Sequence, residues 1–261
     1  MRPEPLMRPE HAMVRTLLVR GMLVGLVAGM VSLIVAKVLG EPQVAAAIAY
    51  ESAHAAAAGG THEPEVFSRN LQSTIGLATG VCVLGVALGG IYSLAYALAQ
   101  GRLGALSARA TAGLLALAGF VTMVVVPFLK YPANPPSIGN PETIGQRTVM
   151  YFALLGASIL AAFVAVKIGR SFAPKRGLWD ATIISAGFFV AAMGLVILVL
   201  PGVDEVPADF PASVLWKFRI ASLAGQFVTW ATIGLLFGAL TEHSLRSAQA
   251  RATGRALEPA L

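Results

Sequence analysis

Six apolar segments alternate with polar stretches along the chain. They cover residues 17–39, 74–100, 110–129, 149–168, 181–200 and 220–241. Each is close to the roughly 20 residues that cross a hydrocarbon core of about 30 Å. Because lipid offers no hydrogen-bond partners to the backbone, each segment must form a helix. The pattern predicts an all-α, polytopic membrane protein with about six transmembrane helices.

Composition agrees with this pattern and sets the domain organisation. The 261 residues are 56% apolar and only 12% charged, whereas soluble domains carry about 25% charge. We expect one transmembrane domain at residues 17–241, with tails at 1–16 and 242–261. The first segment is longer than a signal-peptide core, so we expect it to remain as a span. Cys82 is the single cysteine, which excludes a disulfide framework.

The distribution of charge predicts the orientation. The net charge is +6, but the basic residues lie singly at segment ends and do not form a nucleic-acid surface. Most of them fall on one side of the membrane if both termini are cytoplasmic, as the positive-inside rule requires. The segment interiors contain no acid or histidine, which disfavours a proton relay. They also lack paired acids and an HExxH motif, so an enzyme is not expected.

Two repeated features indicate how the helices are arranged. Glycines recur every four residues at Gly21, Gly25 and Gly29, at Gly76 and Gly80, and at Gly85 and Gly89. This spacing predicts close packing against a neighbouring helix. The outer loops each contain prolines and acids and close with an arginine, at Arg69, Arg147 and Arg219. Three helical hairpins with proline-rich extracytoplasmic loops explain this repeat.

Candidate metal ligands gather in the first outer loop. Residues 40–60 read as a helix that begins near Glu41 with Pro42 in its first turn. Glu51 and His54 are three residues apart and share a face of this helix, a spacing found in carboxylate–histidine metal sites. His62, Glu63 and Glu65 follow. Such donors suit Co²⁺, Ni²⁺ or Zn²⁺. The alternative is a solvated, flexible loop.

The second outer loop, residues 128–148, reads FLKYPANPPSIGNPETIGQRT. Its four prolines fix their φ angles and stiffen the turn. A rigid turn can hold charged and polar side chains over a pore mouth, namely Lys130, Asn134, Glu142 and Arg147. Alternatively, the loop is a structural cap in which Glu142 and Arg147 neutralise each other.

The proline loop resembles the hallmark of the CbtA family, predicted cobalt transporter subunits of bacteria. GEPQVAAAIAYE, SRNLQSTIGL and EVPADFPASVLWKFRIASL extend the resemblance over nearly the whole chain. It implies a multi-span subunit of the plasma membrane that supports cobalt uptake for cobalamin synthesis. It also implies a small single-span partner with a histidine-rich end. The residues in motif positions are Glu41, Glu51, Arg69, Gln72, Lys130, Tyr131, Asn134, Glu142, Arg147 and Arg219.

Together these observations predict a subunit that passes Co²⁺, or a related divalent ion, as cargo without a permanently bound cofactor. The expected metal ligands are Glu41, Glu51, His54, His62, Glu63, Glu65 and Glu142. The expected residues of the loop motif and pore mouth are Arg69, Gln72, Lys130, Tyr131, Asn134, Arg147 and Arg219. The chain lacks a Walker A phosphate loop, so any ATP-driven step belongs to another chain. The alternative is a non-transporting membrane scaffold whose outer loops dock a partner complex.

Overall fold

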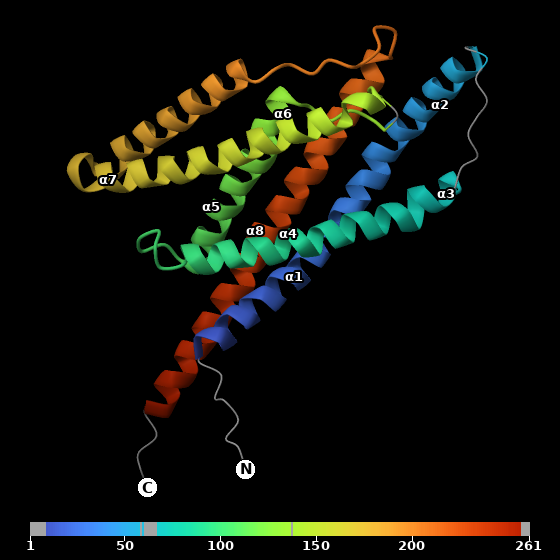
Figure 1. Ribbon diagram of the computed structural model, residues 1–261. Coiled ribbons are helices and arrows are strands. Elements are labelled where there is room, and N and C mark those ends of the chain that lie inside the picture. The colour runs from blue at the N-terminus through green and yellow to red at the C-terminus, as the bar shows by residue number, and fades with distance from the viewer. Residues whose placement is uncertain (1–8, 58, 60–66, 137, 257–261) are drawn as a thin grey trace, which may run out of the picture. The chain divides into compact units, whose positions relative to one another are not determined.

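The computed structural model describes residues 9–57, 59, 67–136 and 138–256, and every regular element among them is helical (Figure 1). Within these residues, five helical stretches are long and apolar enough to cross a membrane. They are Met13–Ala57, Arg69–Ala99, Ala108–Lys130, Ile144–Val199 and Ala212–Thr253. The predicted all-helical membrane fold is confirmed. The chain forms two compact units, the first from Met1–Lys37, Glu65–Leu117 and Ala224–Leu261, the second from Val38–Pro64 and Ala118–Leu223.

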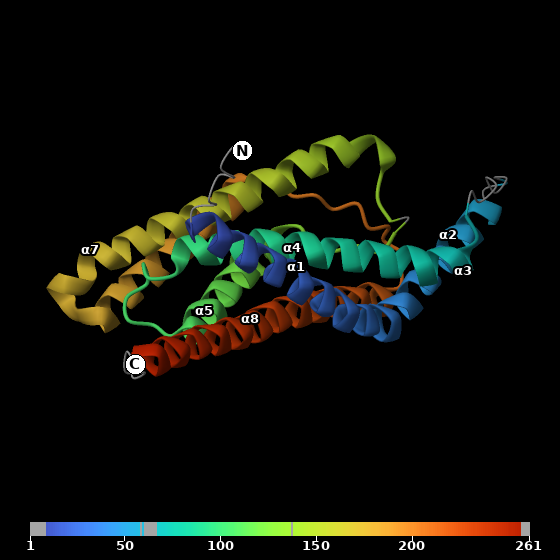
Figure 2. The same ribbon diagram turned by 90° about the horizontal axis from the view of Figure 1, so that it is seen from below.

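In the first unit, glycines let two helices touch backbone to backbone. Helix α1, Pro9–Val35, crosses α4, Leu77–Ala99 (Figures 1 and 2). A Cβ atom on Gly25 would lie 2.1 Å from the carbonyl oxygen of Gly85. A Cβ atom on Gly89 would lie 2.1 Å from the carbonyl oxygen of Gly21. The predicted close packing is confirmed for these glycines, whereas Gly80 meets no described atom within 4 Å and lies outside the interface.

Aromatic rings fill the rest of this unit. Phe237 of α8, Ala212–Ala256, is fully buried and meets the rings of Tyr92 and Tyr96 edge to face. The Tyr92 hydroxyl donates to the carbonyl of Ala112 at 2.6 Å, which joins α4 to α5, Ala108–Phe120. Buried tyrosine hydroxyls usually find a hydrogen-bond partner, and for Tyr92 that partner is the backbone of α5.

In the second unit, one long helix folds back on itself. Helix α7, Ile144–Val199, contains Gly177 at φ 83° and ψ 165°, which are not helical angles. Glycine adopts this positive φ without a Cβ clash, and Figure 1 shows the chain reversing there. The two halves pack together through Leu154, Ala161 and Met193. The fourth and fifth predicted segments, 149–168 and 181–200, therefore lie on the two halves of α7.

Short π-helical segments precede two prolines. The π-helix η1, Ala36–Gly40, leads into α2, Glu41–Ala57, and η3, Val121–Val125, leads into α6, Val126–Lys130. A proline has no N–H to donate and its ring crowds the carbonyl four residues earlier, so the wider π turn accommodates Pro42 and Pro127. The helix predicted to begin near Glu41 is present as α2, but Glu41 does not cap it. The helical conformation continues from α1 through η1 into α2.

We expect Gly85→Ala to destabilise the first unit by about 1–3 kcal/mol, because its methyl group would meet the Gly25 backbone, which cannot swing aside. Thermal unfolding in detergent micelles measures the loss. Gly80→Ala on the same helix is the matched control and should unfold at the wild-type temperature or slightly above it. Equal destabilisation by both substitutions would show that the glycine contact contributes nothing.

Candidate functional site

The proline loop between α6 and α7 is fixed by a carboxylate on another loop. Glu205, in the segment before α8, accepts hydrogen bonds from the Asn140 backbone N–H at 2.9 Å and from the Thr143 hydroxyl. Its carboxylate also lies 3.2 Å from Nη1 of Arg147, in the first turn of α7. Charge-assisted hydrogen bonds are among the strongest polar contacts. One acidic side chain thus joins the proline loop and the segment before α8 to the start of α7.

The neighbouring backbone is shaped to admit this contact. Gly139 has φ 128°, and a Cβ atom there would lie 2.7 Å from Nη1 of Arg147 and 3.0 Å from the Glu205 carboxylate. Arg147 also donates from Nη2 to the Asn140 carbonyl at 3.1 Å. The partner of Arg147 is therefore Glu205, not Glu142 as the structural-cap alternative assumed. The 3₁₀ turn η4, Pro141–Thr143, holds Glu142 in an exposed position.

Three further hydrogen bonds anchor the other end of the loop. Arg219 of α8 donates from Nε to the Ala133 carbonyl at 3.3 Å and from Nη2 to the Asn134 side-chain oxygen at 3.0 Å. The Tyr131 hydroxyl donates to the Pro201 carbonyl at 2.9 Å. The prolines restrict the loop, and these bonds select one of the conformations that remain.

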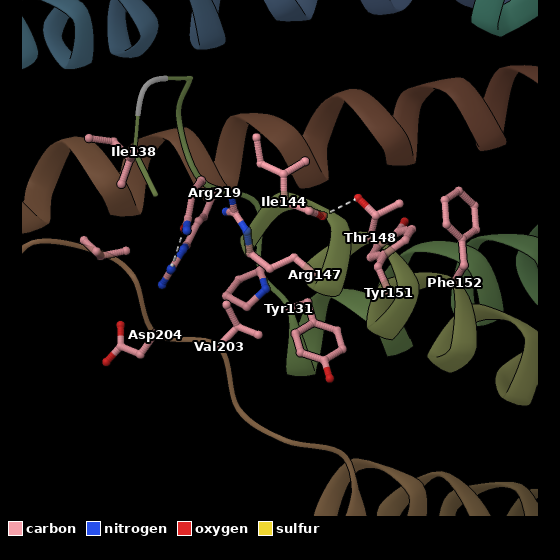
Figure 3. Close-up of a pocket in the computed structure, with 13 residues that line it drawn as sticks. Tyr131, Ile138, Ile144, Arg147, Thr148, Tyr151, Phe152, Val203, Asp204 and Arg219 are labelled. Atoms are coloured by element: carbon pink, nitrogen blue, oxygen red, sulfur yellow. Dashed lines mark hydrogen bonds between the residues drawn. The ribbon is translucent and has the colours of Figure 1, made fainter. Parts of the chain in front are cut away.

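A cavity of about 470 Å³ lies between this loop, the start of α7 and the loop before α8 (Figure 3). Its lining consists of Tyr131, Pro132, Asn134, Ile138, Ile144, Arg147, Thr148, Tyr151, Phe152, Val203, Asp204, Val206 and Arg219. Four of the residues predicted for the pore mouth therefore surround one space, namely Tyr131, Asn134, Arg147 and Arg219. Lys130, at the end of α6, is not part of the lining. Arg69 and Gln72 belong to α3, Arg69–Leu71, and η2, Gln72–Gly76, of the first unit.

A second polar group lies on α2, where the metal ligands were predicted. Nε2 of His54 is 2.7 Å from Oδ2 of Asp209, and the Tyr50 hydroxyl donates to Oδ1 of the same carboxylate at 2.8 Å. Nδ1 of His54 lies 3.0 Å from the Tyr50 carbonyl, so both ring nitrogens face oxygen acceptors. The Tyr50 hydroxyl and then His54 hold the pKa of Asp209 below its usual value. Both charged side chains are more than half exposed.

A small apolar core supports both groups. Ile138 of the proline loop packs with Ala47 of α2 and with Phe210. Tyr50 packs edge to face on the Phe210 ring, with 4.9 Å between ring centroids. Ile138 and Val206 contact this core and also line the cavity. The three outer segments of the second unit are thus packed on one another.

Only some of the predicted metal ligands lie among the described residues. Glu41, Glu51 and His54 lie on α2 and Glu142 lies on η4, while His62, Glu63 and Glu65 fall outside the described residues. Within residues 9–57, 59, 67–136 and 138–256, no three His, Cys, Asp or Glu side chains are grouped so that they could hold a metal ion. His54 and Asp209 remain as one imidazole–carboxylate pair.

The sequence analysis did not select Glu205, Asp209 or Glu242. Glu205 and Asp209 sit among the prolines of DEVPADFP, where acidity and stiffness coincide as they do in the second loop. Glu242 follows the sixth apolar segment directly. In the first unit its buried carboxylate bonds to Arg246 and to the backbone N–H of Arg109. A run of apolar residues that ends in an acid was the available signal for this contact.

Comparison with known proteins identifies one relationship. The model of a family described as a probable cobalt transporter subunit (CbtA) matches residues 14–242. No curated protein and no solved structure matches the chain.

We expect the outer loops to loosen in acid. The Thr143 hydroxyl and the Asn140 backbone, followed by the charge of Arg147, hold the pKa of Glu205 below its usual value. Its contribution to loop order is therefore complete above about pH 4.5 and is lost as pH falls through the lowered pKa. Hydrogen exchange of residues 138–147, corrected for the intrinsic pH dependence, should accelerate on acidification.

Glu205→Gln should speed this exchange at neutral pH and remove the acid-dependent step, because the amide cannot attract Arg147. Glu142→Gln, which removes an exposed carboxylate of η4 in the proline loop, is the matched control and should exchange like the wild type. An acid step that persists unchanged in Glu205→Gln would assign it to another group.

Proposed function

The chain belongs to the CbtA family of probable cobalt transporter subunits, and on this basis we propose that it carries Co²⁺ inward across the bacterial plasma membrane. Membership of a transporter subunit family implies a lipid bilayer and at least one further subunit. A small single-span partner rich in histidine would fit this role by delivering the ion. Co²⁺ is the transported substrate in this proposal.

Six crossings with both termini in the cytoplasm are the topology that we favour. A straight helix of 56 residues would extend roughly 84 Å, far beyond a hydrocarbon core of about 30 Å. The bend at Gly177 makes α7 a pair of helices, each long enough for one crossing. Arg170, Lys175 and Arg176 precede this bend, so the positive-inside rule places it in the cytoplasm. The proline loop and α2 are then extracytoplasmic.

The observation that carries the metal-gathering proposal is the contact between His54 and Asp209. Imidazole nitrogen and carboxylate oxygen are suitable ligands for Co²⁺. They come from distant parts of the sequence, meet at 2.7 Å and remain accessible to water. Co²⁺ would bind between them by displacing the proton on Nε2, as metal binding to histidine requires. Glu41, Glu51, His62, Glu63, Glu65 and Glu142 are the further ligands that we propose for this surface.

The arginine-lined cavity takes a different part in this scheme. Arg147 and Arg219 are permanently charged and would repel a divalent cation. We therefore place the first contact of Co²⁺ on α2, while the proline loop keeps the segment that carries Asp209 in position.

We expect the double substitution His54→Gln/Asp209→Asn to reduce Co²⁺ uptake by about tenfold or more at limiting metal. Loss of a residue that merely orients a ligand already lowers metal affinity by about 10–100-fold. Uptake by cells that lack the endogenous transporter, across a series of Co²⁺ concentrations, measures the effect. Excess metal should restore uptake, because the substitutions weaken capture and leave the helices unchanged.

The matched control is His243→Gln/Asp180→Asn, which replaces an exposed histidine and an exposed aspartate elsewhere. Uptake equal to the wild type in both double variants would exclude His54 and Asp209 as ligands. Purified protein in liposomes, with its partner supplied, tests transport itself. If Co²⁺ entered no faster than into empty vesicles, the chain would be a scaffold for its partner.

A further inference from the structure

The cavity beside the proline loop has two arginines in its lining, and one of them has no acidic partner among the described residues. Arg147 and Arg219 line it together with one acid, Asp204. Glu205 lies behind Arg147 and already accepts three donors. Among the described residues, Asp204 forms no ion pair with either arginine. Arg147 is therefore neutralised by Glu205, whereas the guanidinium group of Arg219 has only neutral oxygens as partners among the described residues.

Neither guanidinium has its donors fully occupied. Arg219 bonds through Nε and Nη2 to two neutral oxygens, which leaves Nη1 without a hydrogen bond to any described residue. Arg147 uses Nη1 and Nη2, and its buried Nε has no hydrogen-bond partner among the described residues. Buried donors in folded proteins are nearly always paired. Because the Nε of Arg147 is closed to solvent, Nη1 of Arg219 is the donor that an anion in the cavity would take.

The opposite wall of the cavity is apolar and faces outward. Ile144 lies beside Arg147 on α7, and Thr148, Tyr151 and Phe152 follow further along the same helix (Figure 3). These positions are about 12 Å apart from first to last along the helix. Phe152 is 61% exposed and Ile144 is 55% exposed, although both lie on a helix that is apolar enough to span a membrane. The cavity is therefore continuous with a surface suited to acyl chains.

This combination points to an amphiphile. The loops lie at the ends of apolar helices, at the level where lipid headgroups meet water. A guanidinium group presents parallel N–H donors that match two oxygens of a phosphate. A free phosphate would use the arginines but would leave the exposed aromatic wall uncovered. A phospholipid satisfies both parts of the cavity.

We propose that this cavity binds the phosphate of an anionic phospholipid, with its acyl chains along Ile144, Tyr151 and Phe152. The lipid would occupy the space between the proline loop and α7 and connect the loop to the bilayer. This site is separate from the His54–Asp209 pair and does not depend on the transported ion. Its test therefore contains no cobalt.

Native mass spectrometry of the purified chain, equilibrated with mixed phosphatidylglycerol and phosphatidylcholine, measures retained lipid. We expect the wild type to retain phosphatidylglycerol selectively and Arg219→Gln to weaken this retention by about tenfold or more, because charge-assisted bonds are lost. Phe152→Ala should also weaken it while leaving the loop contacts intact. Arg176→Gln, an exposed basic residue at the bend of α7, is the control and should retain lipid like the wild type.

Thermal unfolding in phosphatidylcholine alone shows whether each variant is folded. If Arg219→Gln does not fold, Phe152→Ala still tests the proposal. Inorganic phosphate, added in a separate series, distinguishes the two sources of the phosphate group. Displacement of phosphatidylglycerol by millimolar phosphate, or equal retention of both lipids by the wild type, would overturn the proposal. Cross-linking of the cavity to an acidic segment of the partner subunit, in place of lipid, would overturn it as well.

Discussion

Hydrocarbon offers no hydrogen-bond partner to a polar group. This constraint decides which parts of the chain can carry charge and how the ends of the helices are held. The apolar segments form helices because their backbone must bond internally. The acids lie outside the six apolar segments, where donors are available to them. Glu205 and Asp209 each receive two donors from distant parts of the sequence, and Glu242 receives the backbone N–H of Arg109 as well as its neighbour Arg246. These carboxylates join segments that hydrophobic burial alone would not hold together.

The same constraint explains why the helices depend on small residues and irregular turns. In lipid, helices gain little from burying apolar side chains, so close backbone contact has to supply the attraction. Gly25 and Gly85 allow this approach in the first unit. In the second unit, Gly177 allows the reversal of α7, and π turns absorb Pro42 and Pro127 without breaking the helices. The departures from regular α-helix thus have identifiable local causes.

The second unit contains a potential cation site and a potential anion site that share one apolar core. His54 and Asp209 offer ligands to a cation, whereas Arg147 and Arg219 offer donors to an anion. Ile138 and Val206 contact both places, because they belong to the core under α2 and to the cavity wall. A ligand that orders the proline loop would therefore also steady the segment that carries Asp209.

The apolar segments, their helical state and the glycine spacing of α1 could all be predicted from the sequence, because each follows from local composition and a repeat of fixed length. The family resemblance and the stiffness of the proline loop were equally readable, since prolines restrict the backbone wherever they occur. The helix from Glu41 was also predicted, but only the three-dimensional backbone shows that a π turn joins it to α1.

The partners of the charged side chains were decided by the tertiary structure alone. Arg147 pairs with Glu205, 58 residues away, and His54 pairs with Asp209, 155 residues away. No periodicity links such positions, because their distance depends on how the intervening helices pack. Local sequence therefore determined what each segment is, and packing determined which segments meet and what chemistry they form together.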